Sequence, residues 1–261
     1  GITAGLATAG LAHGAVNSYA APRRLAVLVR ALPTTQPEQQ LKRRGPPISA
    51  AFDKQGAPTR AATAFAESCG VALEALGRVT EGKGEFLFFE GSKPGAATAT
   101  LLPGIVQAAL DALPIPKRMR WGASDAEFVR PVHWVLMRLG DEVLSARLLD
   151  TDAGATTRGH RFHAPQSLAV PTPADYAQVL REQGFVIADF AERRERIREA
   201  VTARATVLGG RAVMGDALLD EVTALVEWPV VYVGEFEEQF LQVPQECLIL
   251  TMRTNQKYFP L

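Results

Sequence analysis

The stretch Leu25–Leu32, LAVLVRAL, decides where the fold begins. Its run of leucine, valine and alanine predicts a buried β-strand. Two arginines, Arg23 and Arg24, stand directly before it. They admit two interpretations: cations that clamp the end of the strand, or guanidinium groups that bind phosphate. The first element is therefore assigned, and the role of the two arginines is open.

On the C-terminal side of this strand, residues 33–52, PTTQPEQQLKRRGPPISAAF, are polar, basic and rich in proline, which predicts an exposed loop. A helix is expected over Pro58–Cys69, with Thr59 as N-cap and Gly70 as its end. Residues 85–91, EFLFFEG, predict a short buried strand. A leucine-rich stripe at helical spacing over 101–113 predicts a second helix.

The second half of the chain continues this mixture. Residues 128–150 predict a hairpin with a turn at Gly140-Asp141, and SLAVPTP (167–173) predicts another strand. Three helices are expected over 174–183, 190–208 and 217–228, capped by Asp189 and Asp216 and burying Leu208 and Leu225 among others. Strands at 229–236 and 257–261 flank a helix at 245–256. Because no regular βαβ rhythm is present, the pattern predicts an α+β fold with mixed sheets and packed helices.

Two subdomains are expected, divided near the prolines at 165, 171 and 173. Residues 1–165 would form an N-terminal α+β subdomain with basic loops. Residues 166–261 would form a second, more acidic α+β subdomain that is truncated at its C-terminal end. Residues 1–50 carry six basic residues against one acid, a net charge of +5, whereas 166–261 carry nine against fourteen, a net charge of −5. This gradient favours RNA near residues 23–44 and a protein partner toward the acidic half.

Familiar catalytic and metal motifs are absent from the sequence. It contains no Walker A loop, GxGxxG, HExxH, CxxC, GxSxG or His-Asp pair. Cys69 and Cys247 lie far apart, as expected for reduced thiols in a cytosolic protein. No apolar stretch is typical of a membrane span. We expect no catalytic residue and no metal site in this chain.

One stretch, Thr156–His163 (TTRGHRFH), admits three interpretations. A metal pair at His160 and His163 is disfavoured, because a spacing of three in a strand places them on opposite faces. A packed turn would point Phe162 inward and pair the arginines with acids such as Asp150 or Asp152. An RNA-binding surface would expose Arg158, His160 and Arg161.

Basic residues beside an aromatic residue or a glycine recur in predicted loops. Phosphates bind guanidinium and ammonium groups, and unpaired bases stack on planar side chains, so such loops are typical of RNA contact. Solvated loops and packed turns remain the alternative for each of them. The candidate RNA-binding residues are Arg23, Arg24, Lys42, Arg43, Arg44, Lys117, Arg118, Arg120, Trp121, Arg158, His160, Arg161 and Lys257.

Taken together, several motifs resemble one family. They are SYAAPRRLAVLV, KRRGP, PIPKRMRWG, FVRPVHWV, TRGHRFHAP, EVTALVEWPVVYVGEF and FLQVPQECLILTMRTNQKYFPL. In this order they resemble the N-terminal portion of the β subunit of the bacterial heterotetrameric glycyl-tRNA synthetase. Two departures are Ala21, where the family usually has threonine, and the lack of an EIGTEELP-like segment before Leu11. The family also continues beyond QKYFP into an HD-like domain and an anticodon-binding domain.

The resemblance implies a cytoplasmic glycine-tRNA ligase, active in protein biosynthesis, in which the α subunit binds ATP and Mg²⁺ and forms glycyl-adenylate. It implies that the β subunit supplies tRNA recognition within an α2β2 tetramer. The partners expected are therefore the α subunit and tRNA-Gly, with no membrane and no cofactor on this fragment. The alternative from another class is a self-sufficient metal-dependent hydrolase acting through His160, His163 and nearby acids.

Overall fold

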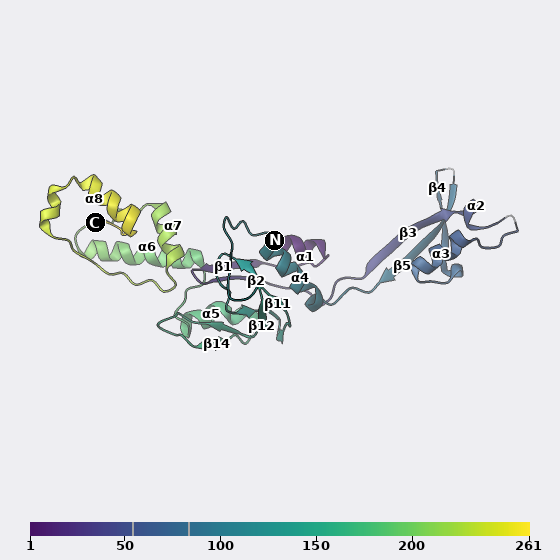
Figure 1. Cartoon of the computed structure of the whole chain (residues 1–261), viewed down its shortest axis with the longest axis horizontal. Helices are drawn as coiled ribbons and strands as arrows, with labels where there is room; N and C mark the ends of the chain where they lie inside the picture. The colour runs from purple at the N-terminus through teal and green to yellow at the C-terminus, as the bar shows by residue number, and fades with distance from the viewer. Residues whose placement is uncertain (54, 83) are drawn as a thin grey trace. The chain divides into compact units, whose positions relative to one another are not determined.

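The computed structural model in Figure 1 describes residues 1–53, 55–82 and 84–261 and divides the chain into two compact units. Unit 1 comprises Gly1–Ala12 and Pro33–Ala109, and unit 2 comprises His13–Leu32 and Leu110–Leu261. This division differs from the boundary expected at residue 165. Strands β13 (Thr156–Arg158) and β14 (Ser167–Ala169) pair with each other across that position, so the intervening residues form a connection inside unit 2.

Unit 1 contains a three-stranded antiparallel sheet in the order β3-β5-β4. These strands are β3 (Gln39–Pro47), β5 (Gly84–Lys93) and β4 (Gly77–Glu81). Helix α3 (Arg60–Cys69) ends at Gly70, as predicted, and packs on the sheet around buried Ala62 and Leu87. Gly45 in β3 allows this packing, because a Cβ there would lie 2.6 Å from the Phe65 ring.

Strand β3 corrects the prediction of an exposed loop over 33–52. Its residues 39–44 pair in register with the predicted strand β5, so the loop prediction was wrong over this range. The polar, proline-rich composition is outweighed by a long neighbouring strand that supplies backbone hydrogen-bond partners. Pro46 and Pro47 lie at the end of β3, where the register shifts between Arg44 and Pro47, and Pro33 and Pro37 precede the strand.

The other elements of unit 1 are helical. The predicted stripe at 101–113 is confirmed as helix α4, and no helix had been predicted before Leu11, where α1 lies. Thr98 at the start of α4 is fully buried, and its hydroxyl donates to the carbonyl oxygen of Pro33 at 2.6 Å. These elements are α1 (Ile2–Thr8), α2 (Ile48–Ala51), the 3-10 helix η1 (Leu73–Ala75) and α4 (Thr98–Asp111).

Unit 2 begins with a hairpin in which β1 (Val16–Ala21) pairs with β2 (Arg24–Val29). The strand predicted from LAVLVRAL is therefore confirmed, but the expectation that it is buried was wrong. Leu25 and Val27 are 62% and 44% exposed, whereas Arg24 is buried. Side chains alternate across a strand, and only one face of this two-stranded hairpin is covered.

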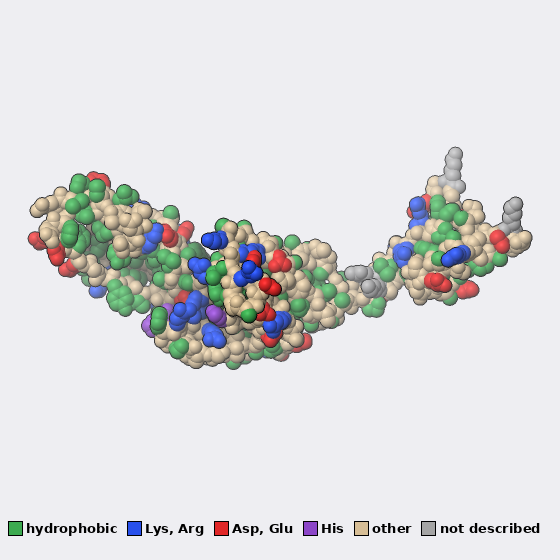
Figure 2. Space-filling model, viewed as in Figure 1, with side chains coloured by type: hydrophobic (Ala, Val, Ile, Leu, Met, Phe, Trp, Pro, Cys, Tyr) green, Lys and Arg blue, Asp and Glu red, His purple; other side chains and the backbone are tan. Residues whose placement is uncertain are grey.

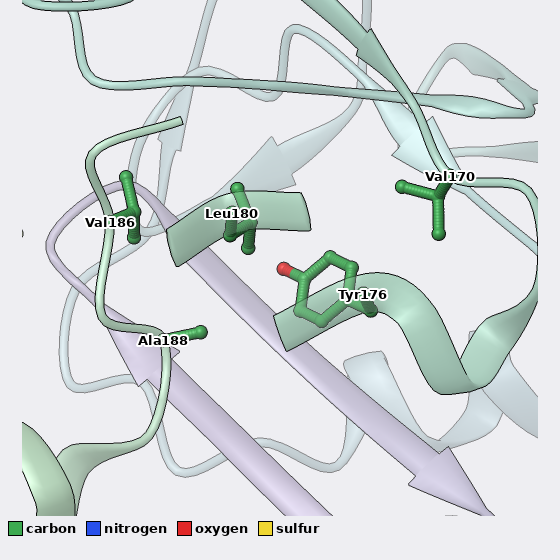
Figure 3. Packing of buried hydrophobic residues seen from close by; sticks show 5 residues of the cluster. All are labelled: Val170, Tyr176, Leu180, Val186 and Ala188. Carbon is green, nitrogen blue, oxygen red and sulfur yellow. The ribbon is translucent and has the colours of Figure 1, made fainter. Parts of the chain in front are cut away.

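The covered face meets a core built around helix α5 (Tyr176–Glu182), shown in Figure 3. In that figure Tyr176, Leu180 and Val186 converge beside the hairpin strands. The rings of Tyr19 in β1 and Tyr176 lie 5.7 Å apart. This packing holds the hairpin turn at a fixed place in unit 2.

Short strands fill the middle of unit 2. Three of them make a sheet in the order β11-β12-β8, in which β12 and β8 are parallel. The predicted turn at Gly140-Asp141 is confirmed between β9 and β10. The strands are β6 (Met119–Arg120), β7 (Glu127–Phe128), β8 (Val135–Leu136), β9 (Arg138–Leu139), β10 (Glu142–Val143), β11 (Arg147–Leu148) and β12 (Thr151–Gly154).

Two helices carry the second core of unit 2. The Asp189 carboxylate caps α6 (Phe190–Val207) by accepting the N–H of Glu192. Helix α7 (Asp216–Leu225) packs on α6 through Leu219 and Ile197. Leu208 and Leu225 are 50% and 61% exposed, so the prediction that they are buried was wrong.

A buried arginine joins these helices to the hairpin. Arg193 in α6 has no exposed surface, and its guanidinium donates to the carbonyl oxygens of Ala20, Ile187 and Thr223 at 2.6–3.1 Å. Burial lowers the pKa of this guanidinium. The sequence pattern placed only apolar residues in this core and missed Arg193.

Beyond α7 the chain differs from prediction. Residues 229–236 and 257–261 form no strand, because within the described residues no neighbouring strand pairs with either. Residues 245–256 are helical, as predicted, and the 3-10 helix η2 precedes α5. These elements are η2 (Pro173–Asp175), η3 (Glu238–Gln242), α8 (Gln245–Thr251) and the π-helical turn η4 (Met252–Gln256).

Both units combine helices with small sheets, antiparallel in unit 1 and including a parallel pair in unit 2, which confirms the α+β prediction. In the part of the chain covered by the structure, no helix is both long enough and apolar enough to cross a membrane.

Candidate nucleic-acid interface

The turn of the β1–β2 hairpin carries a buried ionic cluster. The Glu227 carboxylate, 6% exposed, accepts from Arg23 at 3.2 Å and from Arg24 at 3.0 Å. Arg23 also donates to the carbonyl oxygen of Gly159 at 2.5 Å, and Arg24 to that of Arg158 at 2.6 Å. The clamp interpretation of Arg23-Arg24 is thus supported: both side chains tie the hairpin to the residues after α7 and to the end of β13.

The same cluster fixes the backbone of TTRGHRFH. Gly159 is needed at this point, because a Cβ there would lie 2.3 Å from the carbonyl oxygen of Ala164. The N–H of His160 donates to the carbonyl oxygen of Gly184 at 2.7 Å. Hydrogen bonds with Arg23, Arg24 and Gly184 therefore fix the backbone of the stretch, whereas the side chains of Arg158 and Arg161 stay exposed.

Trp134 forms a flat platform beside this turn. The guanidinium of Arg24 lies 5.6 Å from its ring centroid and that of Arg158 lies 5.9 Å from it. Both distances fall within the range of a cation–π contact. Buried Arg24 fixes the ring from within the protein, and exposed Arg158 brings a second guanidinium to the ring from a solvent-facing side chain.

A cavity of about 350 Å³ opens at this platform. Its lining, which we call the Arg–Trp cavity, consists of Arg23, His133, Trp134, Arg158, Gly159, Arg161 and Pro165. Three of these residues are arginines and none is an acid. The Arg158 and Arg161 guanidinium groups have no carboxylate partner among the residues described, which leaves their charge available to a ligand. Figure 2 shows Lys and Arg side chains beside His side chains on unit 2.

The histidines of TTRGHRFH lie in a turn after β13. Their rings stack with centroids 4.5 Å apart, so the expectation that they face opposite sides of a strand was wrong. The row continues from His163 to Phe185 at 5.7 Å and from Phe185 to Trp228 at 5.5 Å. A local turn, which strand periodicity cannot anticipate, brings these rings together.

The protonation state of His160 follows from the groups around its imidazole ring. Burial lowers the pKa of the imidazole, and the neighbouring His163, Arg23 and Arg24 lower it further, against an opposing effect of Glu227. Its Nδ1 accepts the backbone N–H groups of Phe162 and His163 at 3.3 Å, a role that requires the neutral ring. His160 therefore acts as a neutral brace of the turn.

The packed-turn interpretation fails at two points. Phe162 is 83% exposed and does not point inward. Asp150 and Asp152 pair with Arg147 at 2.7 and 2.9 Å, not with Arg158 or Arg161. The backbone of this stretch is packed, and its cations face outward.

The metal-hydrolase alternative gains no support from this geometry. Across residues 1–53, 55–82 and 84–261, no group of three or more His, Cys, Asp or Glu side chains is placed to hold a metal ion. Glu227, which influences His160, is already paired with two arginines. We do not propose this function.

The Lys42-Arg43-Arg44 candidates lie on β3 in unit 1. Lys42 pairs with Glu90 at 2.8 Å and Arg44 with Glu81 at 2.6 Å, while Arg43 donates to the carbonyl oxygen of Ser68 at 2.8 Å. Arg43 and Arg44 also lie over the rings of Phe65 and Phe86. Their RNA contact stays a prediction; carboxylates of the sheet compensate the charges of Lys42 and Arg44, whereas Arg43 is bonded to a backbone carbonyl oxygen of α3.

The remaining candidates are scattered over unit 2. Arg118 donates to the carbonyl oxygen of Asp111, and Arg120 lies near Asp125 and Glu127 at 3.5 and 3.8 Å. Lys257 pairs with Glu221 at 2.8 Å. Lys117 is exposed and Trp121 half-buried, and neither lines the Arg–Trp cavity. Contact with RNA by these five residues stays a prediction.

Sequence reasoning missed the residues at the centre of the site. The sequence pattern places His133 and Trp134 in the apolar run of a predicted hairpin, and it does not identify Arg23 and Arg24 as the partners of Glu227. A signal was present in the sequence: a His-Trp pair just after a proline interrupts that run. What could not be read is that Arg158 and Arg161, more than twenty residues away, lie beside it.

Comparisons with known proteins agree with the resemblance. The family model described as "Glycyl-tRNA synthetase beta subunit" matches residues 1–261. Among curated relatives, the "Glycine--tRNA ligase beta subunit" of Marinobacter nauticus is 53% identical over 260 residues, which are 99% of this chain and 38% of that protein. The protein of the same name from Pseudomonas putida (strain W619) is 54% identical over 259 residues, 99% of this chain and 37% of that protein.

The chain thus belongs to the glycyl-tRNA synthetase β subunit family. It spans a little more than a third of the length of the curated relatives it matches.

Proposed function

We propose that this chain is a part of a glycine-tRNA ligase β subunit that is not itself catalytic and that supports aminoacylation by binding tRNA-Gly at the Arg–Trp cavity. One observation carries the proposal. Arg158 and Arg161 present guanidinium groups without a carboxylate partner, in the structure as described, beside the aromatic platform of Trp134.

This combination matches the chemistry of RNA. Phosphates bind guanidinium groups, and bases stack on aromatic rings and on guanidinium planes. No acid lines the cavity, so a polyanion bound there meets no carboxylate at contact distance. The α subunit would hold ATP and Mg²⁺ and perform the chemistry, and this chain would position the RNA.

A second contribution, docking of the α subunit, is supported by a different surface. Between Leu225 and Leu261 several large apolar side chains are exposed, including Tyr232 at 87% and Leu241 at 66%. Exposed apolar side chains at this density are typical of protein interfaces. Replacing both by serine in the full-length β subunit should reduce co-purification with α, and unchanged co-purification would argue against this surface.

The test of tRNA binding uses the α–β complex with full-length β carrying Arg158→Ala and Arg161→Ala. Loss of two phosphate contacts should raise the KM for tRNA-Gly by about tenfold. Glycine activation, measured as ATP–pyrophosphate exchange without tRNA, should not change. Arg130→Ala, which removes an exposed arginine outside the cavity, is the control. An unchanged KM in the double variant would refute the proposal.

A further inference from the structure

The Arg–Trp cavity has the size and lining of a site for one small ligand. Pockets for small molecules begin at about 300 Å³ and combine an apolar surface with a few convergent polar groups. This cavity, at about 350 Å³, combines the Trp134 indole and Pro165 with three arginines and His133. A continuous RNA helix, which binds across broad surfaces, would not enter it.

Its aromatic part provides a stacking surface. Trp134 is half-buried and held by Arg24, so the ring is fixed before a ligand arrives. Arg158 extends the surface, because a guanidinium plane stacks on bases as an aromatic ring does. A fixed platform lowers the entropy cost of binding a planar group.

Its charged part selects an anion. Glu227 is an acid that acts on His160 in the turn, and both of its oxygens are used by Arg23 and Arg24. Arg161 is exposed and has no carboxylate partner among the described residues. His133, also exposed, adds a ring nitrogen that can bond to a base edge or to a ribose hydroxyl.

We propose that the Arg–Trp cavity takes one unpaired nucleotide of the RNA, with its base stacked on Trp134 and on the plane of Arg158, and with its flanking phosphates bound by Arg161 and by the in-plane N–H groups of Arg158. The inference rests on the proposed contact with tRNA and adds the kind of nucleotide that is recognised. A base inside a helix has both faces covered by its neighbours, so only an unpaired base can stack on the platform.

Photo-cross-linking tests the inference directly. In a set of tRNA-Gly transcripts, one nucleotide at a time is replaced by 4-thiouridine, and each transcript is irradiated on the complete α–β complex. We expect a cross-link from an unpaired position, mapped by mass spectrometry to residues 133–134 or 158–161. Cross-links to these residues from paired positions only, or from no position while binding is intact, would overturn the inference.

Two substitutions test the stacking. Trp134→Ala should weaken tRNA binding about 5- to 50-fold without changing its salt dependence, because stacking involves no ion release. Trp134→Phe keeps an aromatic face and should bind within about threefold of the unmodified complex. It also keeps the test decisive if Trp134→Ala fails to fold. The control is Phe162→Ala, which removes an exposed ring from the same region that does not line the cavity.

The two proposals fail in distinguishable ways. If Arg158→Ala with Arg161→Ala raises the KM for tRNA but neither Trp134 variant changes binding, the tRNA contact stands and the nucleotide pocket is wrong. If tRNA KM and binding are unchanged in all of these variants, both are wrong.

Discussion

Two groups of basic residues, each beside a glycine in the sequence, differ in the side chains that surround them in the fold. On β3, Lys42 and Arg44 each have a carboxylate within 2.8 Å in the same sheet, that of Glu90 on β5 and that of Glu81 on β4. At the Arg–Trp cavity, Arg158 and Arg161 lie beside a tryptophan, and the cavity lining contains no acid. The charges of the first group are neutralised by carboxylates of the same sheet, whereas the charges of the second group remain available to a ligand.

The contrast shows why a count of charges along a sequence misplaces a binding site. The net charge of +5 over residues 1–50 pointed to Arg23, Arg24 and the Lys42–Arg44 run. Carboxylates far away in sequence, Glu227, Glu81 and Glu90, compensate most of that charge. Uncompensated charge, which only the fold reveals, is the better guide to an RNA-binding surface.

The largest effect should come from Glu227→Gln, because it leaves two arginines of the cluster without their counter-ion. Removing one partner of a buried ion pair costs about 3–5 kcal/mol. We expect a loss of that order in the free energy of local unfolding, measured by hydrogen exchange of amides in β2 and β13 within the full-length subunit.

The matched control is Glu90→Gln, whose carboxylate pairs with Lys42 at the surface, both side chains being more than half exposed. It should change protection in β3 and β5 by less than about 1 kcal/mol. Equal losses in the two variants would mean that the Glu227 cluster is not the anchor of the hairpin.

A smaller effect is expected from His160 as the pH falls. The pKa of His160 is lowered in the folded protein from its ordinary value of 6.5. As the pH falls below about 6.5, the unfolded chain therefore takes up the proton more readily than the folded protein does. Stability of the turn should therefore be complete above about pH 6.5 and decrease as the pH falls further. His160→Asn should reduce this dependence, measured by hydrogen exchange at Phe162 and His163 between about pH 5 and 7.

An unchanged pH dependence in that variant would contradict the role of neutral His160. His13→Asn, which removes a half-buried histidine elsewhere in unit 2, serves as the comparison.

The smallest effect should come from the surface pair of Lys42 itself. Lys42→Met removes a charge that Glu90 compensates, and exposed pairs of this kind contribute about 0.2–1 kcal/mol. We expect tRNA affinity at fixed salt to change by less than about twofold. A tenfold loss would place an RNA contact on β3 and reverse the comparison between the two groups.

Local patterns in the sequence predicted much of the fold. Helices α3, α5 and α6 and strand β5 lie where periodicity and capping residues placed them, with Gly70 and Asp189 at the expected ends. The errors arose where distant pairing decides the outcome. Strand β3 depends on β5, and residues 229–236 have, in the part of the chain that the structure describes, no strand to pair with.

The candidate site was predicted only in part. Arg158 and Arg161 were named because they flank a glycine and an aromatic residue, a local property. Trp134 and Glu227 were missed as partners because their roles depend on contacts more than twenty residues away in sequence. Single-sequence patterns carry no information about such contacts.

The most direct measurement is the salt dependence of tRNA-Gly binding to the α–β complex, for Arg158→Ala with Arg161→Ala and for Arg43→Ala with Arg44→Ala. Each lost phosphate contact lowers the slope of log affinity against log salt by about one. We expect the cavity variant to lose about two units of slope and the β3 variant almost none. An unchanged slope in the cavity variant, or the loss of two units in the β3 variant alone, would contradict an RNA-binding role for the Arg–Trp cavity.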